Sequence, residues 1–136
     1  RDILRRIPVE RVADIPEYDY LGRKVKPTGN YVAPTQEGES GRIQIREDAD
    51  YEAVLAHEIL HGAHSEYEPF RRDLRSGWPE FGRIWLRSFP TYAATFTADP
   101  FHAFTLAAQM SLSYPEQVPL EMYRYFLPLR QGVLTD

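Results

Sequence analysis

Cysteine is absent from this 136-residue chain. Neither a disulfide framework nor a thiolate metal site can therefore form. Concentrated basic charge is missing too: Lys24 and Lys26 are the only lysines, no run of Lys and Arg stands out, and the net charge is −4. A nucleic-acid-binding protein relies on a concentrated basic face, so we expect no nucleic-acid partner.

Long apolar runs are missing as well. None approaches the ~20 residues that a helix needs to cross a bilayer, so we expect no membrane span. The chain begins with Arg1 instead of Met and shows no signal-peptide pattern, which we interpret as a sign of a processed or excised domain. Hydrophobic residues make up 43% and charged residues 26% of the chain, the proportions of an ordinary globular protein. We expect residues 1–136 to form a single domain with one core.

Prolines and glycines divide the chain into short segments. The pattern predicts a helix over residues 9–15, short strands over 23–26 and 30–33 joined by a turn at 27–29, and a strand over 41–47, where polar and apolar residues alternate. Helices are predicted over residues 51–63, 78–87, 99–111 and 119–127, with Gly62 near the end of the first of them. Strands followed by helices indicate an α+β domain.

The most specific motif in the chain is His57-Glu58-Ile59-Leu60-His61. Histidines four residues apart lie on one face of a helix, one turn apart, and can both reach one zinc ion. Glu58 is then placed beside the metal, where it can act as general base toward a metal-activated water. A coincidental pair of surface histidines is the alternative, but apolar Ile59 and Leu60 between them are typical of a half-buried helix. The motif predicts a zinc-dependent peptidase.

A catalytic zinc ion usually takes a third protein ligand. His64 is one candidate, but Gly62 predicts the end of the helix and would leave His64 in an exposed loop. Glu80 follows His61 at a spacing that resembles the thermolysin and aminopeptidase group. Its alternative is an ordinary acidic residue in the first turn of a helix.

Further elements accompany the zinc motif: the strand at 41–47, Phe81-x-x-Ile84-Trp85, Tyr92, a helix that opens near Asp99, and the closing Tyr123-Arg124-Tyr125-Phe126. Together, over about residues 41–126, they resemble the catalytic domain of anthrax lethal factor and the related Pro-Pro endopeptidases. The resemblance implies a zincin-like metallopeptidase fold, a zinc cofactor and the catalytic domain of a secreted toxin or effector. It also implies a protein or peptide substrate in extended conformation, held along 41–47 as an edge strand.

The resemblance extends to the missing ligand. In that family a glutamate near the start of a helix follows a tyrosine. Counting from Tyr92 by the family's interval reaches Asp99, whereas matching the helix start at Asp99-Pro100 puts His102 in the glutamate's place. The second alignment also matches the aromatic and small residues that follow, so we predict His102, with Asp99 and Glu80 as alternatives. The resemblance implies that Tyr92 stabilises the oxyanion. The alternative is that Tyr92 only packs in the core.

We therefore predict an α+β, zincin-like zinc metalloendopeptidase, with His57, His61 and His102 as metal ligands and Glu58 and Tyr92 as catalytic residues. Two alternatives stay open. One is an aminopeptidase-like enzyme that uses Glu80. The other is a degenerate, non-catalytic zincin-like binding domain. This alternative is supported by the absence of the family's glutamate ligand.

Overall fold

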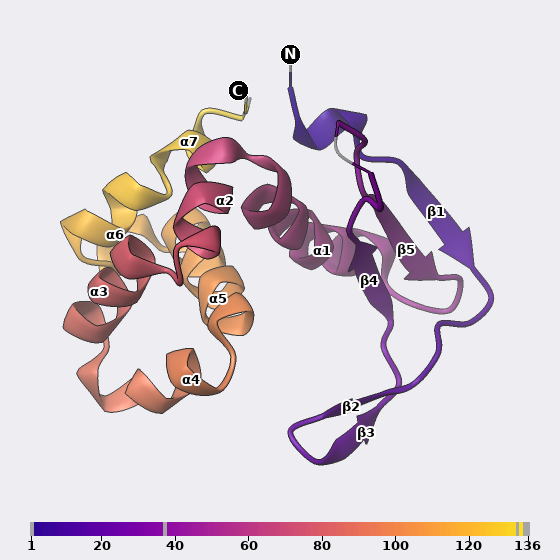
Figure 1. Ribbon diagram of the computed structural model, residues 1–136, viewed down its shortest axis with the longest axis horizontal. Helices are drawn as coiled ribbons and strands as arrows, with labels where there is room; N and C mark the ends of the chain where they lie inside the picture. Colours follow the sequence, from indigo (N-terminus) through magenta and orange to yellow (C-terminus); the bar gives the residue numbers. More distant parts are fainter. Residues whose placement is uncertain (1, 37, 133, 135–136) are drawn as a thin grey trace.

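Residues 2–36, 38–132 and 134 are described by a computed structural model of the chain. Short strands occupy the N-terminal third and helices the rest (Figure 1). The strands are β1 (Val9–Val12), β2 (Tyr18–Tyr20), β3 (Arg23–Val25), β4 (Gly29–Val32) and β5 (Arg42–Arg46). The helices are α1 (Tyr51–Glu66), α2 (Glu68–Arg75), α3 (Pro79–Ser88), α4 (Ala93–Ala98), α5 (Pro100–Ser113), α6 (Leu120–Tyr125) and α7 (Leu127–Arg130). The expected α+β class is confirmed. No helix of the described residues has the length and apolar character that crossing a membrane requires.

Strand β5 is the central strand of the main sheet. The strand order is β1-β5-β4, with β1 parallel and β4 antiparallel to β5. Ile43 lies opposite Val9 on one side and opposite Tyr31 on the other. The prediction that 41–47 is an edge strand is therefore wrong, because the backbone of β5 is paired on both sides. The edge strand beside α1 is β4 instead.

The N-terminal segment also differs from its prediction. Residues 9–15 were expected to be helical, but Val9–Val12 form β1. Valine has its branched carbon next to the backbone and favours strands, and pairing with β5 satisfies the backbone there: Ile43 N–H donates to Pro8 O at 2.8 Å and Glu47 N–H to Val12 O at 2.8 Å. The strands expected at 23–26 and 30–33 do form, but they are not partners of each other. Strand β3 pairs with β2 in a separate hairpin, and β4 pairs with β5.

Helix α1 is longer than the sequence predicts. It begins after Asp50, whose side chain accepts a hydrogen bond from the Ala53 N–H at 3.3 Å, and it continues through Gly62 to Glu66. A Cβ at position 62 would lie 2.7 Å from Cδ1 of Ile7. Gly62 thus allows close packing of the N-terminal segment on α1, and the prediction that it ends the helix is wrong.

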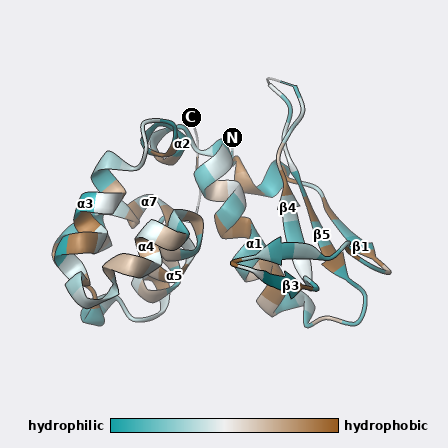
Figure 2. Cartoon of the chain, turned by 60° about the horizontal axis from the view of Figure 1, so that its bottom comes forward, coloured by the Kyte–Doolittle hydropathy of each residue, from teal (hydrophilic) through white to brown (hydrophobic). Residues whose placement is uncertain are grey.

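Two apolar cores lie on opposite sides of α1, whereas the composition led to an expectation of one. The larger joins helices and is rich in aromatic rings, among them Phe70, Trp78, Phe81, Phe104 and Phe126. The smaller lies under the sheet and has Ile7, Ile43 and Ile45 as its buried residues. Ile59 of α1 packs against both. Figure 2 shows the helices on one side of α1 and the sheet on the other. The two cores therefore meet at the helix that carries His57, Glu58 and His61.

The remaining predicted helices are confirmed, with shifted ends. Residues 78–87 correspond to α3, and 99–111 to α5, for which Asp99 is the N-cap: its Oδ1 accepts the His102 N–H at 3.1 Å. The helix expected over 119–127 is divided into α6 and α7 at Phe126.

Candidate metal centre

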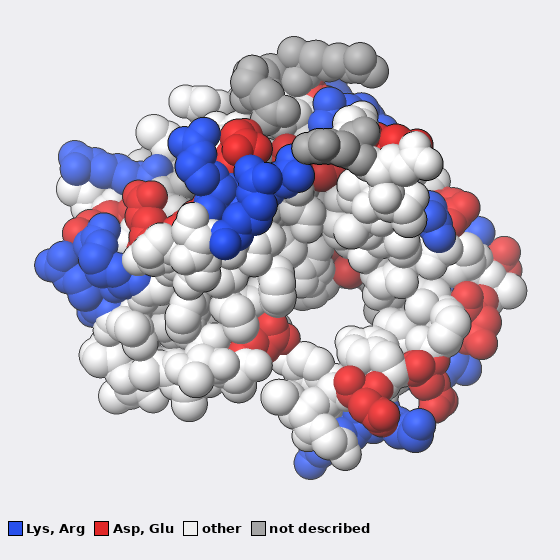
Figure 3. Space-filling model, viewed as in Figure 1, with Lys and Arg blue, Asp and Glu red and all other residues white. Residues whose placement is uncertain are grey.

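The His57-Glu58-Ile59-Leu60-His61 motif lines a cleft of about 710 Å³. Its walls are α1, strand β4 with the turn before it, the β2–β3 hairpin, and the first turn of α5. The surface of the molecule is hollowed between the helices and the sheet, and it is mostly uncharged around the opening (Figure 3). The residues that line the cleft are Tyr18, Tyr20, Pro27, Thr28, Gly29, Asn30, Tyr31, Ala53, Val54, His57, Glu58, His61, His64, Asp99 and Phe101.

His57 and His61 have the spacing that a zinc ion requires. Their Nε2 atoms lie 3.3 Å apart. Two nitrogens that each lie about 2.05 Å from a tetrahedral zinc ion are about 3.3 Å from one another. The donor atoms of His57, Glu58 and His61 all lie within 4.8 Å of one another. The two imidazoles therefore fit as adjacent ligands of one metal ion.

Glu58 is nearly buried beside them, with 5% of its surface exposed. Burial raises the pKa of its carboxyl group from 4.5 to about 7. Strand β4 contributes to this burial, because a Cβ at Gly29 would overlap Val54 and lie 3.3 Å from Cγ of Glu58. The absence of a side chain at Gly29 thus lets β4 lie directly against α1. A carboxyl group with a pKa near neutrality is suited to accepting and returning a proton at pH 7.

The histidine rings of α1 are held neutral. Burial lowers the pKa of His57, and the nearby His102 lowers it further. The pKa of His61 falls to about 4, through burial and the charge of His57, although Asp99 acts in the opposite direction. Neutral imidazoles have the free lone pair that metal binding needs.

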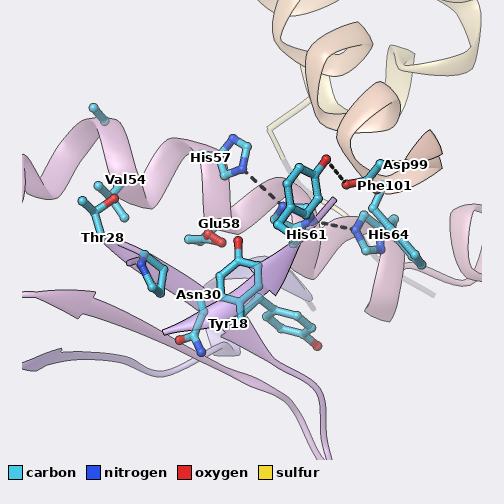
Figure 4. A pocket seen from close by; sticks show the side chains of 15 residues that line it. Tyr18, Thr28, Asn30, Val54, His57, Glu58, His61, His64, Asp99 and Phe101 are labelled. Atoms are coloured by element: carbon cyan, nitrogen blue, oxygen red, sulfur yellow. Dashed lines mark hydrogen bonds between the residues drawn. The ribbon is translucent and has the colours of Figure 1, made fainter. Parts of the chain in front are cut away.

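His64 lies inside the molecule rather than in an exposed loop. It is 4% exposed, and its Nε2 lies 2.9 Å from Nδ1 of His61. Figure 4 shows His57, His61 and His64 in a row along α1, joined by dashed lines, with Glu58 at the side. Burial and the neighbouring His61 lower the pKa of His64 to about 3. The alternative interpretation of His64 as a loop residue is wrong, because α1 continues past Gly62.

The first turn of α5 contains two of the candidate third ligands. Asp99 lines the cleft, and its Oδ2 accepts the Tyr20 hydroxyl at 2.6 Å. That hydrogen bond, burial and the charge of Asp99 raise the pKa of Tyr20 to about 12. His102 is exposed and is not among the lining residues. Among the described residues, neither joins His57 and His61 within 4.8 Å.

Glu80 and Tyr92 do not line the cleft. Glu80 is exposed at the start of α3, where its N–H donates to Oδ1 of Asp73 at 2.9 Å. Tyr92 is 62% exposed, and its carbonyl oxygen accepts the Trp85 Nε1–H at 3.0 Å. The structure thus brings together His57, Glu58, His61, His64 and Asp99, and leaves Glu80, Tyr92 and His102 outside the cleft.

Sequence reasoning missed the side of the cleft opposite α1. Tyr18, Tyr20 and Asn30 come from the hairpin and β4, and the Oδ1 of Asn30 is buried without a hydrogen bond among the described residues. The sequence holds one local signal for the hairpin, Gly22, which occupies one of the two positive-φ positions of the turn, while Leu21 occupies the other. Which side chains such a hairpin would bring to the metal site depends on tertiary packing.

Comparisons of the chain with protein-family models, with curated proteins and with solved structures gave no significant match.

Proposed function

We propose that this chain is a zinc-dependent peptidase domain of zincin-like type, similar to the anthrax lethal factor and Pro-Pro endopeptidase group. The observation that carries the proposal is the 3.3 Å separation of the His57 and His61 Nε2 atoms, with the Glu58 carboxyl group buried beside them in an open cleft. A bound zinc ion supplies Lewis-acid chemistry: it polarises a carbonyl group and lowers the pKa of water to about 7.

Glu58 is the proton carrier of the proposed reaction. Its carboxylate accepts a proton from the attacking water and returns it to the amine that leaves, which requires a pKa near the working pH. Burial against β4 gives Glu58 such a pKa, about 7. Hydrolysis by this route needs no covalent enzyme intermediate.

Strand β4 takes over the role that the sequence assigned to residues 41–47. It borders the cleft, and among the described residues it pairs only with β5. An extended peptide added along its other edge would pass in front of Glu58. Asn30, whose Oδ1 is buried without a hydrogen bond within the described part of the chain, is a further acceptor on that wall.

Two tyrosines compete for the role of hydrogen-bond donor to the oxyanion. Tyr92 is the sequence-based prediction. Tyr20 is favoured by its position in the cleft; its hydroxyl, which donates to Asp99 Oδ2 at 2.6 Å, would have to turn from Asp99 to the oxyanion. The variants Tyr20→Phe and Tyr92→Phe separate the two, since loss of a donor aimed at the oxyanion costs about 10²–10³ in kcat.

The proposal is tested by metal content and proteolysis together. We expect about one zinc per chain, and Glu58→Gln should keep the metal while losing about 10²–10⁴-fold in peptide hydrolysis, because an amide cannot accept the proton. Glu52→Gln makes the same chemical change at an exposed position of α1 and should behave as wild type. Metal binding without hydrolysis by the wild type would instead favour a non-catalytic binding domain.

The third ligand is proposed to come from the first turn of α5, with His102 ahead of Asp99. The Oδ1 of Asp99 already caps α5 and its Oδ2 accepts from Tyr20, whereas the His102 ring makes no hydrogen bond within the described residues. Parallel zinc titrations of His102→Ala, Asp99→Ala and Glu80→Ala decide the matter. Loss of affinity in Glu80→Ala alone would favour the aminopeptidase-like alternative.

A further inference from the structure

The polar ring of His64 lies among aromatic side chains. Its ring lies 5.1 Å from that of Phe101, 5.3 Å from Phe104 and 6.1 Å from Trp78, measured between centroids. These contacts fix the plane and position of the imidazole. A buried polar ring in such a place needs hydrogen-bond partners, or its burial is costly.

Both nitrogens of His64 have a partner. Nε2 lies 2.9 Å from Nδ1 of His61, and Nδ1 lies 3.1 Å from Oγ of Ser65. His61 binds a metal through Nε2 only when its single ring proton is on Nδ1. That N–H must then donate to Nε2 of His64, which places the His64 proton on Nδ1, where it donates to the Ser65 hydroxyl oxygen. With a metal on Nε2 of His61, the row of rings therefore has one consistent arrangement of protons.

We propose that His64 is a positioning residue of the proposed metal site, on which this inference rests. It accepts the Nδ1–H of His61 and so keeps the Nε2 lone pair of His61 aimed at the metal. His64 is then not a ligand itself, since the nitrogen that faces His61 is already occupied. A metal-ligating histidine generally donates its second N–H to a carboxylate, a carbonyl or water. In this chain a third histidine of the same helix takes that role, and aromatic side chains hold its ring in place.

Two substitutions separate positioning from packing. His64→Leu fills the apolar surroundings but removes the acceptor, whereas His64→Gln retains an acceptor oxygen at a similar reach. Zinc affinity is measured by competition with a chromophoric chelator, and ligand geometry by the visible spectrum of Co²⁺ bound in place of zinc. Thermal unfolding of the metal-free proteins serves as the control for folding.

We expect His64→Leu to bind zinc about 10–100-fold more weakly than wild type and to change the Co²⁺ spectrum. His64→Gln should recover most of the affinity. Equal affinity in wild type and His64→Leu, or an equal loss in both variants, would overturn the positioning role. If His64→Leu does not fold, His64→Asn replaces it, because its shorter amide fits the site but cannot reach His61.

One readout keeps this test separate from the proposed function. Long-range ¹H–¹⁵N spectra of the zinc-loaded wild type report which nitrogen of each histidine carries the proton, with no reference to hydrolysis. We expect Nδ1–H for both His61 and His64. If the protein binds zinc but cleaves no peptide, the affinities of the His64 variants still decide the inference. A wild type that binds no zinc would remove both proposals.

Discussion

The helical and sheet regions of this molecule pack against the same helix, α1, but they are stabilised in different ways. The helical region buries many large aromatic rings, and Phe104 alone contacts the rings of Phe70, Trp78, Phe81 and Phe126. In the sheet region the buried residues of the core are three isoleucines, and the β2–β3 hairpin exposes most of its side chains. One wall of the cleft is thus anchored in an extensive core, and the other rests on little buried surface. In the proposed peptidase, the wall anchored in the helical core would hold the metal ligands in place, and the wall made by the sheet region would adapt to the substrate.

The largest expected effect comes from opening the aromatic core. Phe104→Ala should lower the free energy of unfolding by about 3–5 kcal/mol, because the ring is fully buried and its removal leaves a cavity. Tyr114→Ala, at a position 54% exposed, is the control and should change it by about 0.5 kcal/mol or less. Urea denaturation measures both. A small effect of Phe104→Ala would mean that the helical core is not the main source of stability.

A second effect tests whether the sheet really covers α1. Burial gives the folded Glu58 a pKa of about 7, above its ordinary value of 4.5, so the folded state binds the proton more tightly. The resulting stabilisation is present at low pH and is lost as the pH rises through about 7, which leaves a cost on the order of 3 kcal/mol at pH 8.

Glu58→Gln removes this titration. In metal-free protein the variant should be more stable than wild type at pH 8 by about that amount, and the difference should shrink as the pH falls toward 4.5. A difference that is independent of pH would mean that β4 does not shield Glu58 from water.

The smallest effect compares the two cores through one chemical change. Ile45→Val in the sheet and Ile84→Val in α3 each remove one methylene group from a buried site and should each cost about 0.5–1.5 kcal/mol. Native-state hydrogen exchange distinguishes them. We expect Ile45→Val to speed exchange in β4 and β5 while the α3 amides are unaffected, and Ile84→Val to have the opposite distribution. Identical patterns would mean that the two regions open as one unit.

The sequence predicted the local features of this molecule better than its long-range pairing. Alternation at 41–47 and the Asp99-Pro100 helix start are local signals, and both elements form. The role of β5 as the central strand depends on pairing with Val9–Val12, which no local pattern reports. The role of Gly62 is also long-range: the missing side chain makes room for Ile7, more than 50 residues away in the chain.

The candidate site shows the same contrast between local features, which the sequence predicts, and long-range contacts, which it does not. His57, Glu58 and His61 are brought together by helix geometry alone, so their spacing was predictable. Tyr20 reaches Asp99 only because the hairpin extends to the start of α5. The position of His64 depends on the continuation of α1 past Gly62 and on two aromatic neighbours, Trp78 just before α3 and Phe104 in α5.

Helix α1 is shared by both cores, so a ligand that binds to α1 affects both by mass action. A ligand that binds His57 and His61 only in the folded helix stabilises every element packed on that helix, by RT ln(1 + [L]/Kd). At a free zinc concentration of 100 times Kd this amounts to about 2.7 kcal/mol, more than the loss of a methylene group from either core. For the proposed zinc site, the zinc concentration of the surroundings would thereby shift the stability of both regions that pack on α1.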